Sequence, residues 1–294
     1  FGVDAIIFFQ DILTPLAPMG IPFAFRPGPV TARPIRTAAD VASLRRFDPD
    51  RDVPFVPQTL RLVRDALRGE LPLLGFAGAP LTLAFFMIEG GSPSNGDASA
   101  EPTAPHARSM MQGDPALLHR LLDMLADMTA DYLAMQIEAG VDAVQLFESC
   151  ADLLTPEEYR EFAHPYHERI FARLGGRVPT ILFAKEQTCL ELMARSGADV
   201  LSVGTGVDIA DASVRFGGRV AIQGNVDNRL VAGGTPDEVE EAVRKCVRAG
   251  GHTGHILNLN HGLLKETPVE NVVRLIETCK RTSVRPNSAQ PARV

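Results

Sequence analysis

The sequence predicts an α/β fold in which buried parallel strands alternate with helices, as in a TIM (β/α)8 barrel. A phrase Gly-x-Asp opens three apolar runs, at Gly2–Ile6, Gly140–Val144 and Gly197–Leu201. The last two follow helical patterns, and glycine readily adopts the left-handed conformation that ends many helices. Each of these two copies therefore marks the joint between a helix and the buried strand that follows it.

Seven apolar runs have the length of strands: Val3–Phe9, Leu73–Ala77, Ala143–Phe147, Thr180–Ala184, Val200–Val203, Val220–Gln223 and His255–Leu259. Helical patterns separate most of them, as parallel strands require. A dinucleotide-binding sheet is disfavoured because Gly75–Pro80 lacks the G-x-G-x-x-G spacing. The eight-stranded barrel is preferred. Since the chain begins at Phe1, almost directly in a strand, we expect the first barrel strand to be absent from it.

The longest predicted helix covers Asp114–Ala139. Its apolar side chains recur every three or four residues, which is typical of a helix with one buried face, at Leu118, Leu121, Leu125, Met128, Tyr132 and Met135. Asp114 and Pro115 favour a helix start, and Gly140 favours its end. Other helix starts carry the pattern T-P-x-E at Thr155, Thr235 and Thr267, which predicts a capping box at each.

We expect a single barrel domain over residues 1–281, with a loop or insertion at residues 90–107 and a disordered tail at residues 282–294. The loop is rich in Gly, Ser, Pro, Asn and Ala, and the tail reads SVRPNSAQPARV after its first residue.

The composition excludes several classes of protein. The net charge of −7, without a long basic block, disfavours a nucleic-acid partner. No apolar stretch reaches 18 residues, so we expect no membrane partner. The four cysteines are scattered without a CxxC pair, which fits a reduced, cytoplasmic protein. No HExxH motif accompanies the seven histidines, and we expect no metal site.

Polar residues follow several of the predicted strands: Asp11, Glu148 with Ser149, Lys185 with Glu186, Asn225 with Asp227, and Asn260 with His261. In a barrel such residues converge at the carboxyl ends of the strands, where barrel enzymes have their active sites. Each also has a structural interpretation. Asp11 would then be a turn cap, Ser149 a hydrogen-bonded linker and His261 a core histidine. Lys185 is either a Schiff-base nucleophile or an ion-paired strand end.

Several motifs in order resemble the uroporphyrinogen decarboxylase family, a TIM-barrel family of the haem pathway. They are IIFFQDIL (Ile6–Leu13), GFAGAPLTL (Gly75–Leu83), IEGG (Ile88–Gly91), QLFES (Gln145–Ser149), FAK (Phe183–Lys185), QGNVD (Gln223–Asp227) and NHG (Asn260–Gly262). The resemblance extends from Gly2 to about Thr278, nearly the whole chain.

The resemblance implies an activity and a set of site residues. The family removes the four acetate carboxyl groups of uroporphyrinogen III to give coproporphyrinogen III, without a cofactor, and the resemblance suggests a homodimer. Asp11 is the implied catalytic carboxylate, which accepts hydrogen bonds from the pyrrole N–H groups. Phe76 and Phe147 would face the tetrapyrrole. Ser149 and His261 match positions that contact its carboxylates or nearby polar groups.

The sequence also departs from the family pattern. Phe86 replaces the usual tyrosine, Gly204-Thr205 replaces Asp-Trp, and Asn260 replaces the first glycine of GHG. We still expect Phe86 to contact the substrate, without the hydroxyl. The family's N-terminal arginine-rich motif is not in this sequence. Two alternatives therefore stay open: a zinc- and corrinoid-dependent methyltransferase of similar fold, and a tetrapyrrole-binding relative without catalytic activity.

Overall fold

A computed structural model describes residues 1–26, 28–93, 103–251 and 253–282. The chain forms two compact units. The large unit contains Asp4–Ala184 and Cys189–Ala198. The small unit contains Phe1–Val3, Lys185–Thr188 and Asp199–Val294.

The large unit is built on a parallel sheet with the strand order β1-β4-β5-β6. Its strands are β1 (Ile6–Ile7), β4 (Leu73–Gly78), β5 (Ala143–Glu148) and β6 (Thr180–Ala184), with an antiparallel pair β2 (Ala24–Phe25) and β3 (Pro29–Val30). Its α-helices are α1 (Ala38–Ala42), α2 (Pro49–Asp52), α3 (Phe55–Leu67), α4 (Pro80–Glu89), α5 (Pro105–Gly113), α6 (Pro115–Glu138), α7 (Pro156–Phe162), α8 (His164–Leu174) and α9 (Leu190–Arg195). Two 3-10 turns, η1 (Thr14–Leu16) and η2 (Ala151–Leu153), follow β1 and β5.

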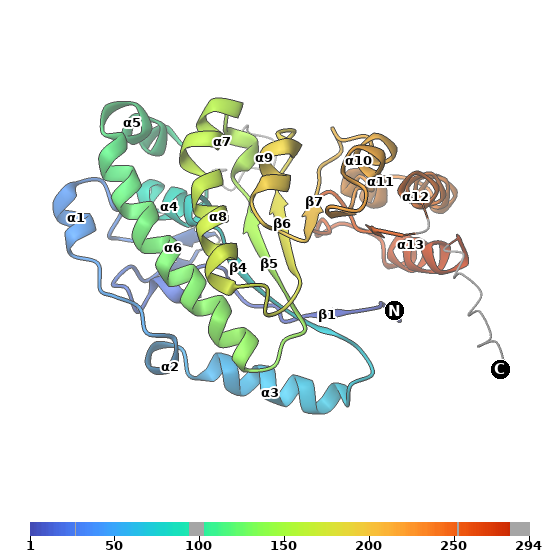
Figure 1. Ribbon diagram of the computed structural model, residues 1–294, viewed down its shortest axis with the longest axis horizontal. Helices are drawn as coiled ribbons and strands as arrows, with labels where there is room; N and C mark the ends of the chain where they lie inside the picture. Colours follow the sequence, from blue (N-terminus) through green and yellow to red (C-terminus); the bar gives the residue numbers. More distant parts are fainter. Residues whose placement is uncertain (27, 94–102, 252, 283–294) are drawn as a thin grey trace. The chain divides into compact units, whose positions relative to one another are not determined.

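Helices α6 and α8 pack against each other across one face of the strands β4 to β6 (Figure 1). The predicted start of α6 is confirmed, since the Asp114 side chain accepts the Leu117 N–H at 3.0 Å and Pro115 begins the helix. All six apolar side chains expected on its inner face are buried. Burial of this stripe attaches α6 to the sheet and to α8.

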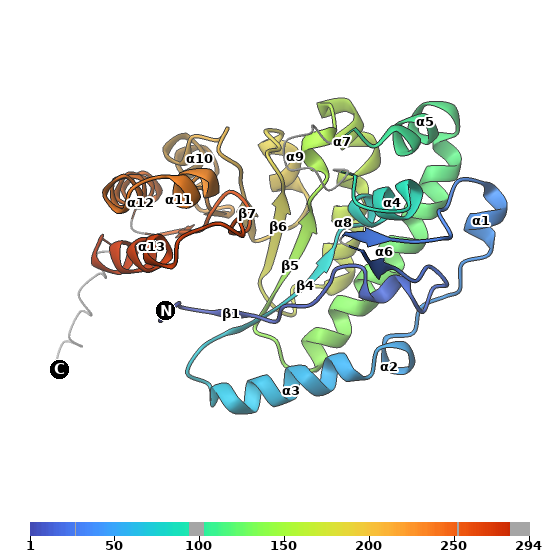
Figure 2. The ribbon, with the colours of Figure 1, turned by 180° about the vertical axis from the view of Figure 1, so that it is seen from behind.

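The small unit has the parallel strand order β7-β8-β9. Its elements are β7 (Val200–Ser202), α10 (Ile209–Phe216), β8 (Ala221–Gln223), α11 (Asn228–Gly233), α12 (Pro236–Gly250), β9 (His255–Ile256) and α13 (Val269–Thr282). Helix α12 lies beside α13 (Figure 2). A half-exposed ion-pair cluster joins them, in which Glu240 of α12 binds Arg244 of its own helix and Arg274 of α13.

All seven predicted strands are present, but most are shorter than expected. The first shrinks to Ile6–Ile7 at the edge of the large sheet, where Phe9 is 89% exposed. The short β2–β3 pair was not predicted. At the end of the predicted loop 90–107, Pro105 already begins α5. Residues 94–102 of that loop and residues 283–294 of the predicted tail lie outside the described residues.

The T-P-x-E pattern produces capping boxes at two of its three positions. Thr155 and Thr235 each accept the N–H of the glutamate three residues on, and that glutamate bonds back to the threonine N–H. The prediction for Thr267 is wrong, because its buried hydroxyl oxygen has no hydrogen-bond partner among the residues that the structure describes. There α13 begins at Val269, with backbone bonds from Asn271 and Val272 to the Pro268 carbonyl.

Candidate active site

Asp11 follows β1 and lies against the carboxyl end of the large unit's sheet. A Cβ on Gly78, the last residue of β4, would lie 3.2 Å from the Cβ of Ile12, so the turn after Asp11 packs closely on that glycine. Asp11 Oδ1 accepts the Leu13 N–H at 2.7 Å, as the turn-cap interpretation expects. Its Oδ2 has no hydrogen-bond partner among the described residues. The exposed carboxylate thus combines a local structural bond with a free acceptor oxygen.

Three phenylalanines form a row across the adjacent strands β4, β5 and β6. The ring of Phe147 lies edge-on to Phe76, with centroids 5.7 Å apart, and tilted against Phe183 at 5.5 Å. Phe76 and Phe183 are buried, and Phe147 is half-buried. The strands therefore present an aromatic wall. Phe183 was not selected from the sequence, because its contact with Phe147 depends on strand register, which the FAK motif alone does not reveal.

Gln136 of α6 holds the backbone of Phe76 where the edge strand β1 has ended. The last bond from that segment to β4 runs from the Phe8 N–H to the Leu74 carbonyl. Two residues further on, Gln136 accepts the Phe76 N–H and donates to the Phe76 carbonyl, each at 2.9 Å. A Cβ on Gly75 would lie 2.5 Å from Gln136 Oε1, so glycine is required for this approach.

A fully buried polar network surrounds the end of β5. The Thr82 hydroxyl donates to Glu148 Oε1, and Glu148 Oε2 lies 3.1 Å from His167 Nε2. His167 Nδ1 lies 3.4 Å from the Tyr159 hydroxyl. Burial, reinforced by the negative charge of Glu148, raises the pKa of Tyr159 well above its ordinary value, so this hydroxyl keeps its proton. Thr82, Tyr159 and His167 were not selected from the sequence as parts of this site.

Ser149 follows Glu148 directly and is half-buried. Its hydroxyl makes no hydrogen bond within the part of the chain that the structure describes. The alternative interpretation of Ser149 as a hydrogen-bonded linker is therefore not supported.

In the small unit, Glu186 collects donors from two strand ends. Its carboxylate accepts the Asn260 Nδ2–H at 2.9 Å and the Thr205 N–H and hydroxyl at 3.3 and 3.1 Å. Partial burial raises the pKa of Glu186, but these bonds outweigh it and leave the pKa below its ordinary value. A Cβ on Gly204 would lie 2.4 Å from Glu186 Oε2. The departures at Gly204 and Asn260 thus meet at one carboxylate.

His261 is exposed and lies on a turn held by Asn228 of α11. The Asn228 N–H bonds Asn260 Oδ1, and its Nδ2–H bonds the Gly262 carbonyl, each at 2.8 Å. The core-histidine interpretation of His261 is therefore wrong. Of the site residues predicted from the sequence, Asp11, Phe76, Phe86, Phe147 and Ser149 belong to the large unit and His261 to the small unit.

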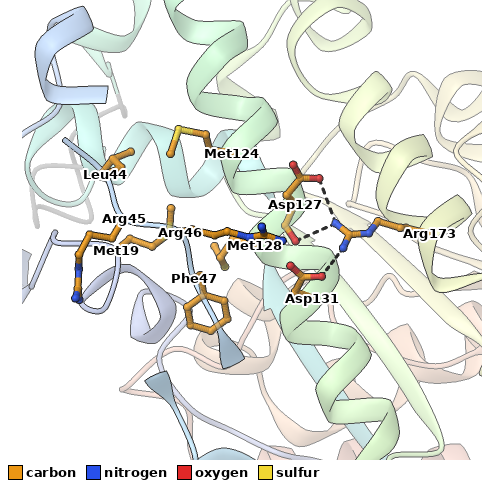
Figure 3. Close-up of a pocket in the computed structure, with 10 residues that line it drawn as sticks. All are labelled: Met19, Leu44, Arg45, Arg46, Phe47, Met124, Asp127, Met128, Asp131 and Arg173. Atoms are coloured by element: carbon orange, nitrogen blue, oxygen red, sulfur yellow. Dashed lines mark hydrogen bonds and ion pairs between the residues drawn. The ribbon is translucent and has the colours of Figure 1, made fainter. Parts of the chain in front are cut away.

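A surface pocket of about 580 Å³ lies beside α6, and no predicted site residue lines it (Figure 3). Its polar wall is an ion-pair cluster, in which Arg173 of α8 binds Asp127 and Asp131 of α6. Within the described residues, no group of three or more His, Cys, Asp or Glu side chains is placed to hold a metal ion. No described helix is both long and apolar enough to cross a bilayer.

Comparison with known proteins identifies the family. The model of the uroporphyrinogen decarboxylase (URO-D) family matches residues 1–282. The chain belongs to the uroporphyrinogen decarboxylase family. It is 40% identical to a uroporphyrinogen decarboxylase of Picosynechococcus sp., over 95% of this chain and 79% of the relative. A relative of the same name from Geobacter sulfurreducens is 38% identical, over 96% of this chain and 81% of the relative.

Solved structures confirm the fold prediction. A methyltransferase from Methanosarcina mazei superposes with a TM-score of 0.74 over 95% of this chain and 81% of its own. A B12-independent methionine synthase from Shewanella sp. reaches 0.52 over 77% of this chain and 65% of its own. Identities of 18% and 13% make these likenesses of fold alone.

In this uroporphyrinogen decarboxylase family member, Phe86 lies in α4. This helix follows β4 at the carboxyl end of the sheet. Phe86 is half-buried, and its carbonyl accepts the N–H of Gly90, the residue that ends the helix. As a phenylalanine, it has no hydroxyl with which to make a hydrogen bond.

Proposed function

We propose that the chain converts uroporphyrinogen III to coproporphyrinogen III by removing four acetate carboxyl groups, without a cofactor. The observation that carries this proposal is 40% identity to proteins named uroporphyrinogen decarboxylase, over 95% or more of this chain and about four fifths of theirs. The exposed carboxylate and the aromatic wall at the sheet's carboxyl end support it.

Each decarboxylation needs an electron sink. A proton first adds to a pyrrole ring carbon and makes the ring cationic. The bond to the carboxylate then breaks, CO2 leaves, and the electron pair neutralises the ring. A proton from solvent ends on the exocyclic carbon, which becomes a methyl group, while the ring carbon loses its added proton. Stabilising the cationic ring lowers the barrier of this reaction.

Asp11 is the proposed source of that stabilisation. An ionised carboxylate only accepts hydrogen bonds, so its free Oδ2 suits the pyrrole N–H groups. The Leu13 N–H fixes the other oxygen and so orients the carboxylate before substrate arrives. Preorganised charge of this kind avoids the cost of reorganisation during the reaction.

The aromatic wall of Phe76 and Phe147, extended by Phe183, is proposed to bind the faces of the pyrrole rings. Aromatic rings attract a cation to their faces, so the wall would favour the protonated ring as well as exclude water. We assign Phe86 to the same apolar surroundings.

Ser149 is proposed to donate its hydroxyl hydrogen to a carboxylate of the substrate. Its lack of a hydrogen-bond partner within the described residues supports this role. His261 is proposed to contact polar groups of the substrate. That assignment rests on the family pattern and on the exposure of the side chain.

The activity is tested by incubating the purified chain anaerobically with uroporphyrinogen III and separating the oxidised products by chromatography. We expect coproporphyrinogen III with intermediates of fewer lost carboxyl groups. Binding of uroporphyrinogen without CO2 release would instead support a non-catalytic relative. Bound zinc with methyl transfer would instead support the methyltransferase alternative. The Methanosarcina mazei protein, which shares the fold, is named a methyltransferase.

Asp11 is tested by Asp11→Ala and Asp11→Asn. Both should lower turnover at least about 100-fold, as removal of a key electrostatic group does. Asp11→Asn keeps an oxygen for the Leu13 N–H, so its loss of activity would separate charge from turn formation. Asp208→Ala is the matched control, because Asp208 is exposed and caps α10 by accepting the Asp211 N–H. Near-native turnover in Asp11→Asn would overturn the role given to the charge.

We also propose that the protein is a cytoplasmic homodimer. All four cysteines are free thiols, which fits a reducing compartment. Light scattering during size-exclusion chromatography tests the dimer, and a mass near 31.7 kDa would contradict it.

A further inference from the structure

We propose that Thr82, Glu148 and His167 form a buried positioning element that fixes Ser149 for contact with substrate carboxylates. The inference rests on the proposed function, since it assigns Ser149 that contact. None of the three side chains touches solvent, as each has a relative exposure of 0%. They act through Ser149 and are positioning residues.

The Thr82 hydroxyl is bonded to both neighbours of Ser149. It donates to the side chain of Glu148, and it accepts the Cys150 N–H at 3.2 Å. The residues before and after Ser149 are therefore tied to a single oxygen atom on α4. This arrangement holds the turn on both sides of Ser149, whose own hydroxyl makes no hydrogen bond within the described residues.

The chemistry of the groups dictates the direction of these bonds. An ionised Glu148 only accepts, so Thr82 must donate its one hydrogen to it and keeps its lone pairs for the Cys150 N–H. Glu148 Oε2 likewise accepts from His167 Nε2. His167 Nδ1 lies 3.4 Å from the Tyr159 hydroxyl, and the tautomer of His167 decides which of the two donates. The network extends from α4 through β5 to α8 and α7.

Burial makes the network costly to break. A buried carboxylate needs donors for its oxygens, and loss of one leaves a charged group unsatisfied. Apolar side chains would fill this space at similar stability, so packing alone does not call for a carboxylate here. What the polar groups provide and apolar side chains could not is the hydrogen bond from the Cys150 N–H, next to Ser149, to the Thr82 hydroxyl.

The test compares Thr82→Val, which keeps the shape and loses the hydroxyl, with Thr82→Ser, which keeps it. We expect Thr82→Val to raise KM for uroporphyrinogen about tenfold with kcat changed less than about twofold, because a ground-state contact is weakened. Thr82→Ser should stay near wild type. In a Ser149→Ala background, Thr82→Val should cause little further loss, because coupled residues are non-additive. Additive losses in the double variant would overturn the proposal.

A second measurement is independent of catalysis. Amide hydrogen exchange at Cys150 in the ligand-free protein should be at least tenfold faster in Thr82→Val than in Thr82→Ser. Equal exchange rates in the two variants would also overturn the proposal. If the wild-type protein makes no product but the two variants still differ in exchange, only the proposed function is overturned. If Thr82→Val does not fold, His167→Gln, which keeps a donor for Glu148, is compared with His167→Leu by the same two measurements.

Discussion

The two units hold their predicted carboxylate-binding residues in similar ways but in different surroundings. In the large unit, Thr82 is bonded to both neighbours of Ser149, and in the small unit Asn228 is bonded to both neighbours of His261. A glutamate completes each arrangement. Glu148 is fully buried, whereas Glu186 is partly exposed. The same local design therefore depends on enclosed charge in one unit and on solvated charge in the other.

The largest expected difference between the units is in stability. Glu148→Ala leaves the Thr82 hydroxyl and His167 without their buried partner, and we expect it to lower the free energy of unfolding by about 3–5 kcal/mol. Glu186→Ala should cost less than about 1 kcal/mol, because water can reach the donors around this partly exposed carboxylate. Urea denaturation of both variants measures this. Equal losses would show that burial does not distinguish the two glutamates.

A smaller contrast concerns two buried glutamines. Gln136→Met leaves both the N–H and the carbonyl of Phe76 unpaired. Each unpaired group should lower the free energy of unfolding by about 1–3 kcal/mol. Gln223→Met is the matched control in the small unit, because the Gln223 Nε2–H makes one bond, to the Ser202 hydroxyl at 3.0 Å. We expect about 1 kcal/mol for that bond. If Gln136→Met lowers the free energy of unfolding no more than Gln223→Met does, then water or other groups replace the hydrogen bonds of Gln136 to Phe76.

The sequence was informative wherever a local pattern carried the structure. The strands follow apolar runs, and α6 follows an apolar stripe with a cap at Asp114. The strand ends were located for the same reason, since a polar residue directly after an apolar run can be recognised in the sequence itself. Even the departures at Gly204 and Asn260 were visible as isolated differences from a pattern.

The contacts that connect these residues were not predictable, because they join distant segments. His167 reaches Glu148 from a helix 19 residues away, and Gln136 reaches Phe76 from 60 residues away. Neither has a local signal, since a buried polar side chain on a helix looks like any polar residue. Thr267 shows the opposite failure, because its capping pattern is present while its hydroxyl has no partner in the described part of the chain.

The smallest expected effect is the pH dependence of Glu186. Its hydrogen bonds hold the pKa in the folded state below the ordinary value of 4.5, so the folded state favours the charged form. This contribution is fully present above the ordinary pKa and is lost as the pH falls through the lower folded-state pKa. At pH 7, Glu186→Gln should therefore have a free energy of unfolding lower than that of wild type by less than about 1 kcal/mol. This difference should vanish in acid.

Urea titrations from pH 7 to pH 3 measure the pH effect, with Asn260→Gly as the partner variant. That change removes the Nδ2–H donor to Glu186. With only the donors of Thr205 and Gly206 left, the folded-state pKa of Glu186 should lie closer to its ordinary value, so the pH dependence should become shallower. A pH dependence unaltered by Asn260→Gly would show that Thr205 and Gly206 hold the carboxylate without Asn260. The substitution at residue 260 would then have no electrostatic link to Glu186.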